Sequence, residues 1–160
     1  MNLLKFYPTP PSLIDKMLDG IDFKQIDTIL EPSAGTGNIC DAVNKKWKYA
    51  RNIYTHKEEE YRGDIDCIEY DNDLRGVLKE KKYRVVHDDF LTYRSMKKYD
   101  LIIMNPPFSE GDKHLMKAID LQETYGGMVI CILSRFSRVL MANCGRRPRL
   151  LILVALSKFT

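Results

Sequence analysis

Short apolar runs alternate along this chain with longer stretches in which apolar residues recur at helical spacing. The runs that predict strands are Thr28–Leu30, Ile65–Tyr70, Tyr83–His87, Leu101–Met104 and Met128–Leu133. The stretches that predict helices are Leu13–Leu18, Ile39–Trp47, Asp73–Lys81 and Asp112–Glu123. This alternation predicts parallel strands joined by right-handed crossovers, and so a doubly wound, three-layer α/β/α domain. Residues 49–64 show no period and predict an exposed loop.

Two of the helix starts carry residues suited to capping. Three prolines precede Ser12, which is predicted to cap the helix that Gly20 ends. Asp71 is predicted to cap the helix that begins at Asp73.

The first strand runs into a glycine-rich turn, Glu31-Pro32-Ser33-Ala34-Gly35-Thr36-Gly37-Asn38. A strand, a turn of this kind and a helix bring backbone N–H groups close to a ligand, and Gly35 and Gly37 permit positive φ. Asn38 stands after Gly37, so the third glycine of the dinucleotide fingerprint is missing. Glu31 would repel a pyrophosphate and attract an amino group. The turn therefore predicts a zwitterionic or cationic ligand, with a plain structural turn as the alternative.

A second motif closes the fourth strand, where Asn105-Pro106-Pro107-Phe108 follows an apolar run. The prolines lack N–H groups and have a fixed φ, so the turn is stiff and its carbonyls stay outside the strand ladder. The alternative is a rigid turn that only ends the strand.

Together these two motifs resemble class I S-adenosylmethionine-dependent methyltransferases that modify amino groups, above all the gamma-type N6-adenine DNA methyltransferases. The resemblance covers about residues 6–134. It implies a Rossmann-like, mainly parallel sheet of order 3-2-1-4-5, S-adenosylmethionine as cofactor, DNA as partner and methylation of adenine N6. The same tetrapeptide occurs in family members that methylate RNA bases or a protein glutamine amide. A truncated domain that binds the cofactor without turnover is a further alternative.

The resemblance implies cofactor contacts at the ends of the strands. Glu69 would accept from the ribose hydroxyls with Tyr70 beside adenine, although Asp71 also has the acidic character required at that strand end. Asp89 would accept from the adenine amino group and Phe90 would pack on its face, with Asp88 or a simple turn as alternatives. The full predicted cofactor set is Thr9, Glu31, Pro32, Ala34, Gly35, Gly37, Asn38, Glu69, Tyr70, Asp89, Phe90 and Asn105.

The predicted catalytic set is Asn105, Pro106, Pro107 and Phe108. An exocyclic amine on a base is a poor nucleophile because its lone pair is delocalised into the ring. Two acceptors, the Asn105 side-chain carbonyl and the Pro106 backbone carbonyl, can pull it toward a tetrahedral form. Phe108 offers an aromatic face to an extruded base. Positioning would then supply most of the acceleration.

Charge is distributed unevenly along the 160 residues. The net charge is +3, yet residues 135–160 hold six basic residues and no acid, which leaves 19 of the 25 basic residues with all 22 acids in residues 1–134. We therefore expect a methyltransferase domain at 1–134 and a basic, apolar tail at 135–160. The tail is either a DNA-binding segment or an altered or truncated remainder of the domain. Its run Leu150–Leu156 would be a surrogate strand or an exposed apolar segment.

The remaining composition bears on compartment and metals. Cys40, Cys67, Cys131 and Cys144 are scattered without a CxxC motif, so neither a metal site nor a disulfide is predicted. No signal-peptide stretch or membrane-span-length apolar run is present, and a cytoplasmic location is expected. Neither the oligomeric state nor a recognition sequence follows from the pattern.

Overall fold

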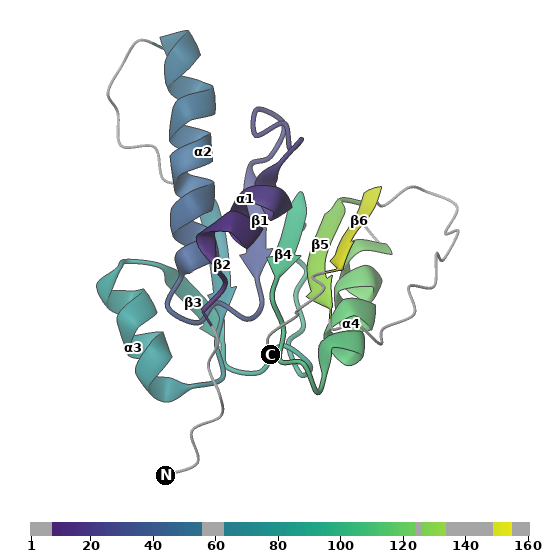
Figure 1. The fold of residues 1–160 in the computed structure, drawn as a ribbon. Helices are drawn as coiled ribbons and strands as arrows, with labels where there is room; N and C mark the ends of the chain where they lie inside the picture. The colour runs from purple at the N-terminus through teal and green to yellow at the C-terminus, as the bar shows by residue number, and fades with distance from the viewer. Residues whose placement is uncertain (1–7, 56–62, 124–125, 134–148, 155–160) are drawn as a thin grey trace.

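Parallel strands form a single sheet in the computed structural model, which describes residues 8–55, 63–123, 126–133 and 149–154 (Figure 1). The strand order is β3-β2-β1-β4-β5-β6, and every neighbouring pair is parallel. The order predicted for the first five strands is confirmed. The strands are β1 Thr28–Glu31, β2 Asp64–Ile68, β3 Arg84–His87, β4 Leu101–Met104, β5 Met128–Leu133 and β6 Arg149–Val154.

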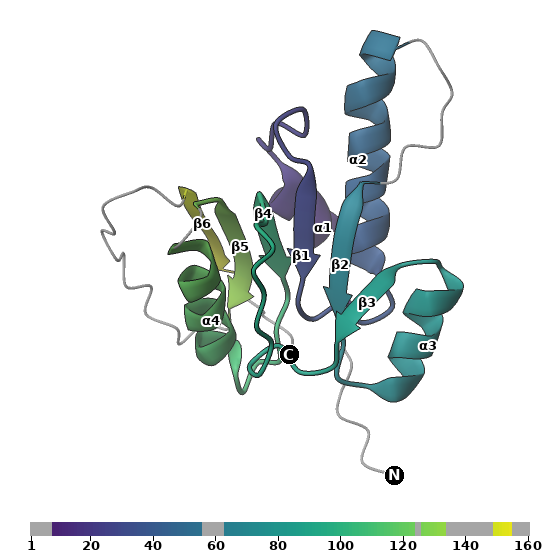
Figure 2. The same cartoon turned by 180° about the vertical axis from the view of Figure 1, so that it is seen from behind.

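Helices cover both faces of the sheet, as the front and back views show (Figures 1 and 2). They are α1 Pro11–Leu18, α2 Asn38–Thr55, α3 Asn72–Glu80 and α4 Gly111–Glu123. Successive strand residues point to opposite faces, so Ile103 joins the core under α1 and α2 while Ile102 joins the core under α4. All four residues of β4 are apolar and buried, because both faces of the strand pack into a core. The apolar run in the sequence is therefore continuous rather than alternating.

The helix starts show one wrong prediction and one that is confirmed. Pro10 is the N-cap of α1 and Pro11 its first residue, with no side-chain cap, so Ser12 is not the cap. Proline suits this first position because its φ is already helical and its missing N–H is not needed there. Asp71 caps α3 as predicted, since its carboxylate accepts from the backbone N–H groups of Asp73 and Leu74.

Helix α2 is longer than the sequence pattern indicated. It continues to Thr55, so residues 49–55 of the predicted loop are helical, while 56–62 lie outside the described residues. Buried Trp47 fixes the helix to the body by donating from Nε1 to the Ile26 carbonyl at 2.7 Å. Beyond Trp47 neither glycine nor proline interrupts the sequence up to Thr55, so nothing in these turns stops the helix.

Strand β6 adds to the edge of the sheet beside β5. Six residue pairs join them in parallel, from Met128–Arg149 to Leu133–Val154. Of the two alternatives for Leu150–Leu156, a strand on the sheet is the one observed for Leu150–Val154, and the last two residues of the run lie outside the described ranges. The rest of the predicted tail lies outside the described residues. Among the helices described, none combines the length and apolar character needed to cross a bilayer.

Candidate active site

The predicted site residues gather where β1, β2, β3 and β4 end. Because the strands are parallel, these ends form one edge of the sheet, and the loops that follow them face one another. Two hydrogen bonds join the first two loops there: the Ala34 N–H donates to the Ile68 carbonyl at 3.0 Å, and the Gly35 N–H donates to Glu69 at 2.7 Å. A third bond joins Thr9 to Asn105.

The glycine turn requires both of its glycines. Gly35 and Gly37 have φ of 55° and 83°, in the left-handed region that favours glycine. A Cβ at Gly37 would also lie 3.1 Å from a methyl of Leu78 and 3.2 Å from the Tyr83 ring. The turn is therefore packed tightly against α3 and β3.

The rest of the turn is held by its own short bonds. The Gly37 N–H donates to the Ala34 carbonyl at 2.7 Å, and the Thr36 hydroxyl donates to the side chain of Asn38 at 3.0 Å. Pro32 and Ala34 are buried beneath it. These residues shape the turn, and their contact with a cofactor stays a prediction.

Hydrogen bonds from Lys81 and Tyr83 support the glycine turn and the start of α2, and the sequence did not predict them. Lys81 Nζ donates to the Thr36 carbonyl at 2.8 Å and to Asp41 Oδ2 at 2.7 Å. The hydroxyl of Tyr83 donates to the other oxygen of Asp41 at 2.6 Å. Burial and the bond to Asp41 raise the pKa of Tyr83, so it remains a donor. About forty residues separate these partners, and no local spacing could have revealed them.

Glu31, the last residue of β1, is 1% exposed. Burial raises its pKa to about 8, despite a hydrogen bond from the Cys40 thiol to Oε2 at 3.0 Å, and the nearby Glu69 raises it further. Cys40 itself lies 3.5 Å from the sulfur of Cys67, and this contact, with burial, raises the Cys40 pKa well above its usual value. Burial thus favours the protonated form of Glu31, whereas an adjacent cation would favour its ionised form.

Glu69 follows β2 and is half-buried. Its two carboxylate oxygens accept from the Gly35 N–H at 2.7 Å and the Asp71 N–H at 2.9 Å. The carboxylate therefore ties the glycine turn to the end of β2 and keeps lone pairs for other donors. Tyr70 beside it is 70% exposed, which leaves its ring available to a ligand.

The loop after β3 places its two predicted residues differently. Asp89 is half-buried, and its Oδ1 accepts from the Leu91 N–H at 2.9 Å. Phe90 is 2% exposed and packs against the His114 ring of α4, with ring centroids 5.5 Å apart. Its stacking on adenine stays a prediction, and its burial limits the ring surface that a ligand could reach. Asp88 is exposed and pairs with His87 at 3.1 Å.

In the turn after β4, two carbonyl oxygens accept no backbone N–H from the described residues. Asn105 Nδ2 donates to Thr9 Oγ1 at 3.0 Å, whereas Asn105 Oδ1 is buried and accepts no hydrogen bond from the described residues. The Pro106 carbonyl likewise accepts no backbone bond from them, while the Pro107 carbonyl accepts from Glu110 at 3.0 Å. Phe108 is 54% exposed at the same edge.

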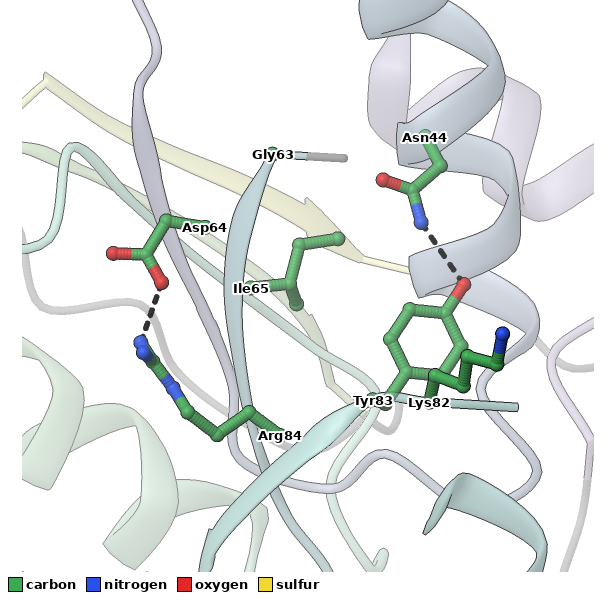
Figure 3. A pocket seen from close by; sticks show the side chains of 7 residues that line it. All are labelled: Asn44, Gly63, Asp64, Ile65, Lys82, Tyr83 and Arg84. Atoms are coloured by element: carbon green, nitrogen blue, oxygen red, sulfur yellow. Dashed lines mark hydrogen bonds and ion pairs between the residues drawn. The ribbon is translucent and has the colours of Figure 1, made fainter. Parts of the chain in front are cut away.

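A cavity of about 190 Å³ lies at the opposite edge, where β2 and β3 begin (Figure 3). Its polar groups are largely engaged with one another: Asn44 donates to the Tyr83 hydroxyl at 3.1 Å and Arg84 pairs with Asp64. Parallel sheets bind ligands at the carboxyl ends of their strands, so the other edge is the candidate site. Within the described ranges, no group of three or more His, Cys, Asp or Glu side chains could hold a metal ion.

Comparison with known proteins gives a consistent class. The family model for the methyltransferase small domain matches residues 17–122. A mitochondrial ribosomal RNA small subunit methyltransferase of Arabidopsis thaliana is 23% identical over 145 residues, covering 86% of this chain and 34% of its own length. The dimethyladenosine transferase of Schizosaccharomyces pombe is 24% identical over 135 residues, covering 84% and 41%.

A type II methyltransferase and a solved structure are also similar to this chain. The type II methyltransferase M.CvrRI of Paramecium bursaria Chlorella virus XZ-6E is 28% identical over 101 residues, covering 62% of this chain and 23% of its own. This chain thus spans about a quarter to two fifths of the length of these relatives. The solved StiE O-MT, residues 942–1257, is alike in fold, with a TM-score of 0.55, 13% identity and coverage of 75% and 41%.

Proposed function

The chain belongs to the methyltransferase small domain family, and from this premise we propose that it transfers a methyl group from S-adenosylmethionine to the exocyclic N6 of adenine in DNA. Family membership implies S-adenosylmethionine as the cofactor. The choice of adenine rests on the turn Asn105–Phe108 and its surroundings, and the choice of DNA rests on the resemblance of the two motifs to gamma-type N6-adenine DNA methyltransferases.

The residues at the edge where β1, β2, β3 and β4 end suit this cofactor. Its cationic amino group would be held by Glu31, a buried carboxyl that pairs with no basic side chain among the described residues. The ribose hydroxyls would donate to Glu69, whose oxygens each accept one backbone N–H and retain further lone pairs. Asp89 and Tyr70 flank the adenine end. Gly35 and Gly37 allow the backbone to approach closely.

The proposed chemistry needs little acid–base help. The bound cofactor supplies a methyl group on an activated sulfonium. Asn105 Oδ1 and the Pro106 carbonyl each accept a hydrogen bond from one of the two N–H groups of the adenine amine. These two hydrogen bonds turn the lone pair of the nitrogen toward the methyl carbon. With the cofactor bound, its sulfonium would supply the methyl carbon: a nitrogen–carbon bond would form as the carbon–sulfur bond broke, and the nitrogen would then lose one proton to water. Phe108 holds the extruded base by stacking.

The observation that supports this proposal most directly is the buried Asn105 Oδ1. An unsatisfied buried carbonyl costs free energy, and a donor from the substrate would satisfy it. An amine with two hydrogens can donate one hydrogen bond to this oxygen and the other to the Pro106 carbonyl. The same geometry also suits adenine N6 in RNA, and the names of two relatives favour that second candidate, since they describe a ribosomal RNA methyltransferase and a dimethyladenosine transferase.

The test is labelled-methyl transfer to DNA, RNA and protein in parallel, with adenine N6 as the identified product position. Asn105→Ala is expected to lower transfer about 100-fold or more, while S-adenosylmethionine affinity by calorimetry changes little. Phe108→Ala should weaken base capture by roughly 1–3 kcal/mol. Transfer at the wild-type rate by Asn105→Ala would refute the mechanism, and label in RNA alone would favour the second candidate.

A further inference from the structure

We infer that Thr9 is a positioning residue that acts through Asn105, and that its hydroxyl orients the Asn105 carbonyl toward the acceptor amine. The inference rests on the proposed function, because it concerns the group that receives the methyl. It assigns Thr9 a role other than the cofactor contact that the sequence suggested.

The contact joins two proline-stiffened segments that are 96 residues apart in sequence. Asn105 Nδ2 donates to Thr9 Oγ1 at 3.0 Å, and Thr9 is 8% exposed. Thr9 stands before Pro10, so its backbone is held away from the helical region. Asn105 stands before Pro106 and is restricted in the same way.

Helix α1 anchors the Thr9 side of this contact. The Pro10 carbonyl accepts from the N–H groups of Leu13 and Ile14 at 3.0 Å each. Ile14 and Met17 are buried in the core under α1 and α2. Thr9 therefore occupies a fixed position relative to the sheet edge, which a residue that orients a catalytic group requires.

A carboxamide has a donor end and an acceptor end, so fixing one end decides where the other points. With the NH₂ group bound to Thr9, Oδ1 is the end left without a partner among the described residues. The opposite orientation would direct an NH₂ group at the amine hydrogens and repel them. Donation from Nδ2 also polarises the amide and strengthens Oδ1 as an acceptor.

The alternative role, contact with the cofactor, predicts the opposite kinetic result. If Thr9 held the cofactor, its loss would weaken cofactor binding and leave turnover at saturation near the wild-type value. A positioning role predicts that kcat falls while cofactor affinity stays the same.

The experiment measures kcat and the S-adenosylmethionine Kd for Thr9→Val, which removes the hydroxyl and keeps the shape. We expect kcat to fall about 10- to 100-fold with Kd within twofold of wild type, and Thr9→Ser to restore most of the loss. In an Asn105→Ala background Thr9→Val should cause no further loss. Ser12→Ala, which removes a hydroxyl of α1 that caps no helix, is the matched control and should change neither constant.

Weaker cofactor binding at unchanged kcat would overturn the inference. A readout without substrate separates its failure from that of the proposed function: the side-chain amide resonances of Asn105, identified by their absence in Asn105→Ala, should shift in Thr9→Val. If the wild-type chain methylates no adenine, the proposed function fails, and unshifted Asn105 amide resonances in Thr9→Val would still overturn the Thr9 contact.

Discussion

At the scale of single residues, the candidate active site contains two buried polar groups that have few protein partners among the described residues. Glu31 is buried with its pKa raised to about 8, and Asn105 Oδ1 is buried without a donor from the described residues. Such groups cost stability in the folded chain and are retained where a ligand satisfies them. The pKa of Glu31 lies above its ordinary value of 4.5, which means that folding favours the protonated carboxyl. The stability that the protonated form gives the folded chain is fully present below pH 4.5 and is lost as the pH rises through about 8.

We predict that binding of S-adenosylmethionine at pH 7 releases close to one proton. The free chain holds Glu31 protonated, and a cationic amino group beside it would lower its pKa and ionise it. Affinity should therefore rise with pH up to about 8. Calorimetry in buffers of different ionisation enthalpy measures the released proton, and Glu31→Gln should abolish the release. An equal release in Glu31→Gln would place the cofactor's cation elsewhere.

At the scale of elements, the glycine turn is shaped by the α3–β3 connection as well as by its own sequence. Lys81 binds the Thr36 carbonyl, and Tyr83 and Lys81 together hold both oxygens of Asp41 in α2. Lys82 between them has a φ of 63°, which reverses the chain tightly enough for its neighbours to act on the same turn. The glycine turn and α3 are therefore expected to respond together to mutation.

Two glycines on these elements form a matched pair. Gly37→Ala places a Cβ in a left-handed backbone and 3.1 Å from Leu78, so we expect destabilisation by about 1 kcal/mol or more and weaker cofactor binding. Gly76→Ala lies inside α3 with no atom within 4 Å of the added Cβ, so it should stabilise the chain by about 0.5–1 kcal/mol. Urea unfolding measures both changes. A neutral Gly37→Ala would show that the turn adapts.

At the scale of the whole molecule, the buried carboxylate of Asp66 joins strand β2 to strand β3 and to the crossover between β3 and β4. Asp66 of β2 is 2% exposed, pairs with Arg84 of β3 and accepts from Lys97 Nζ and the Tyr99 hydroxyl at 2.8 Å each. The crossover from β3 to β4 contains no helix, and this network holds it against the sheet. Burial would raise the pKa of Asp66, but these hydrogen bonds outweigh burial and lower it.

We predict that Asp66→Asn destabilises the folded chain by about 2–3 kcal/mol, because it removes the negative charge that pairs with both Arg84 and Lys97. The loss is limited because both cations are partly exposed to solvent. Because the folded pKa is lowered, the wild-type contribution is present above pH 3.8 and is lost as the pH falls below it. Urea unfolding between pH 3 and 7 should show this loss in wild type only. Asp64→Asn, which removes an exposed partner of the same cations, should cost about 1 kcal/mol or less.

We propose that residues 1–134 form the methyltransferase unit and that 135–160 are separable from its cofactor site. The proposed cofactor residues lie at or just after the carboxyl ends of β1, β2, β3 and β4, whereas β6 pairs with β5 at the far edge of the sheet. Deleting 135–160 is expected to leave S-adenosylmethionine affinity within a fewfold of wild type by calorimetry. Loss of cofactor binding together with lower solubility would show instead that the tail is integral to the fold.

The sequence by itself determined the features that depend on near neighbours. Strands β4 and β5 begin and end at the predicted residues, because apolar runs bounded by Asp100, Asn105 and Gly127 need no distant information. The cap of α3 was predictable since Asp71 contacts residues two and three positions ahead. The sheet order followed from the resemblance of the two turns.

Tertiary structure alone decided how the site residues are held and charged. The contacts of Thr9 with Asn105 and of Lys81 with Thr36 join residues 96 and 45 positions apart, and such bonds leave no periodic trace in a sequence. The protonation of Glu31 depends on how much water the surrounding elements exclude, which residue identity does not record. Local pattern therefore specifies where the turns stand, whereas the packing between elements specifies which of their atoms remain free for a ligand.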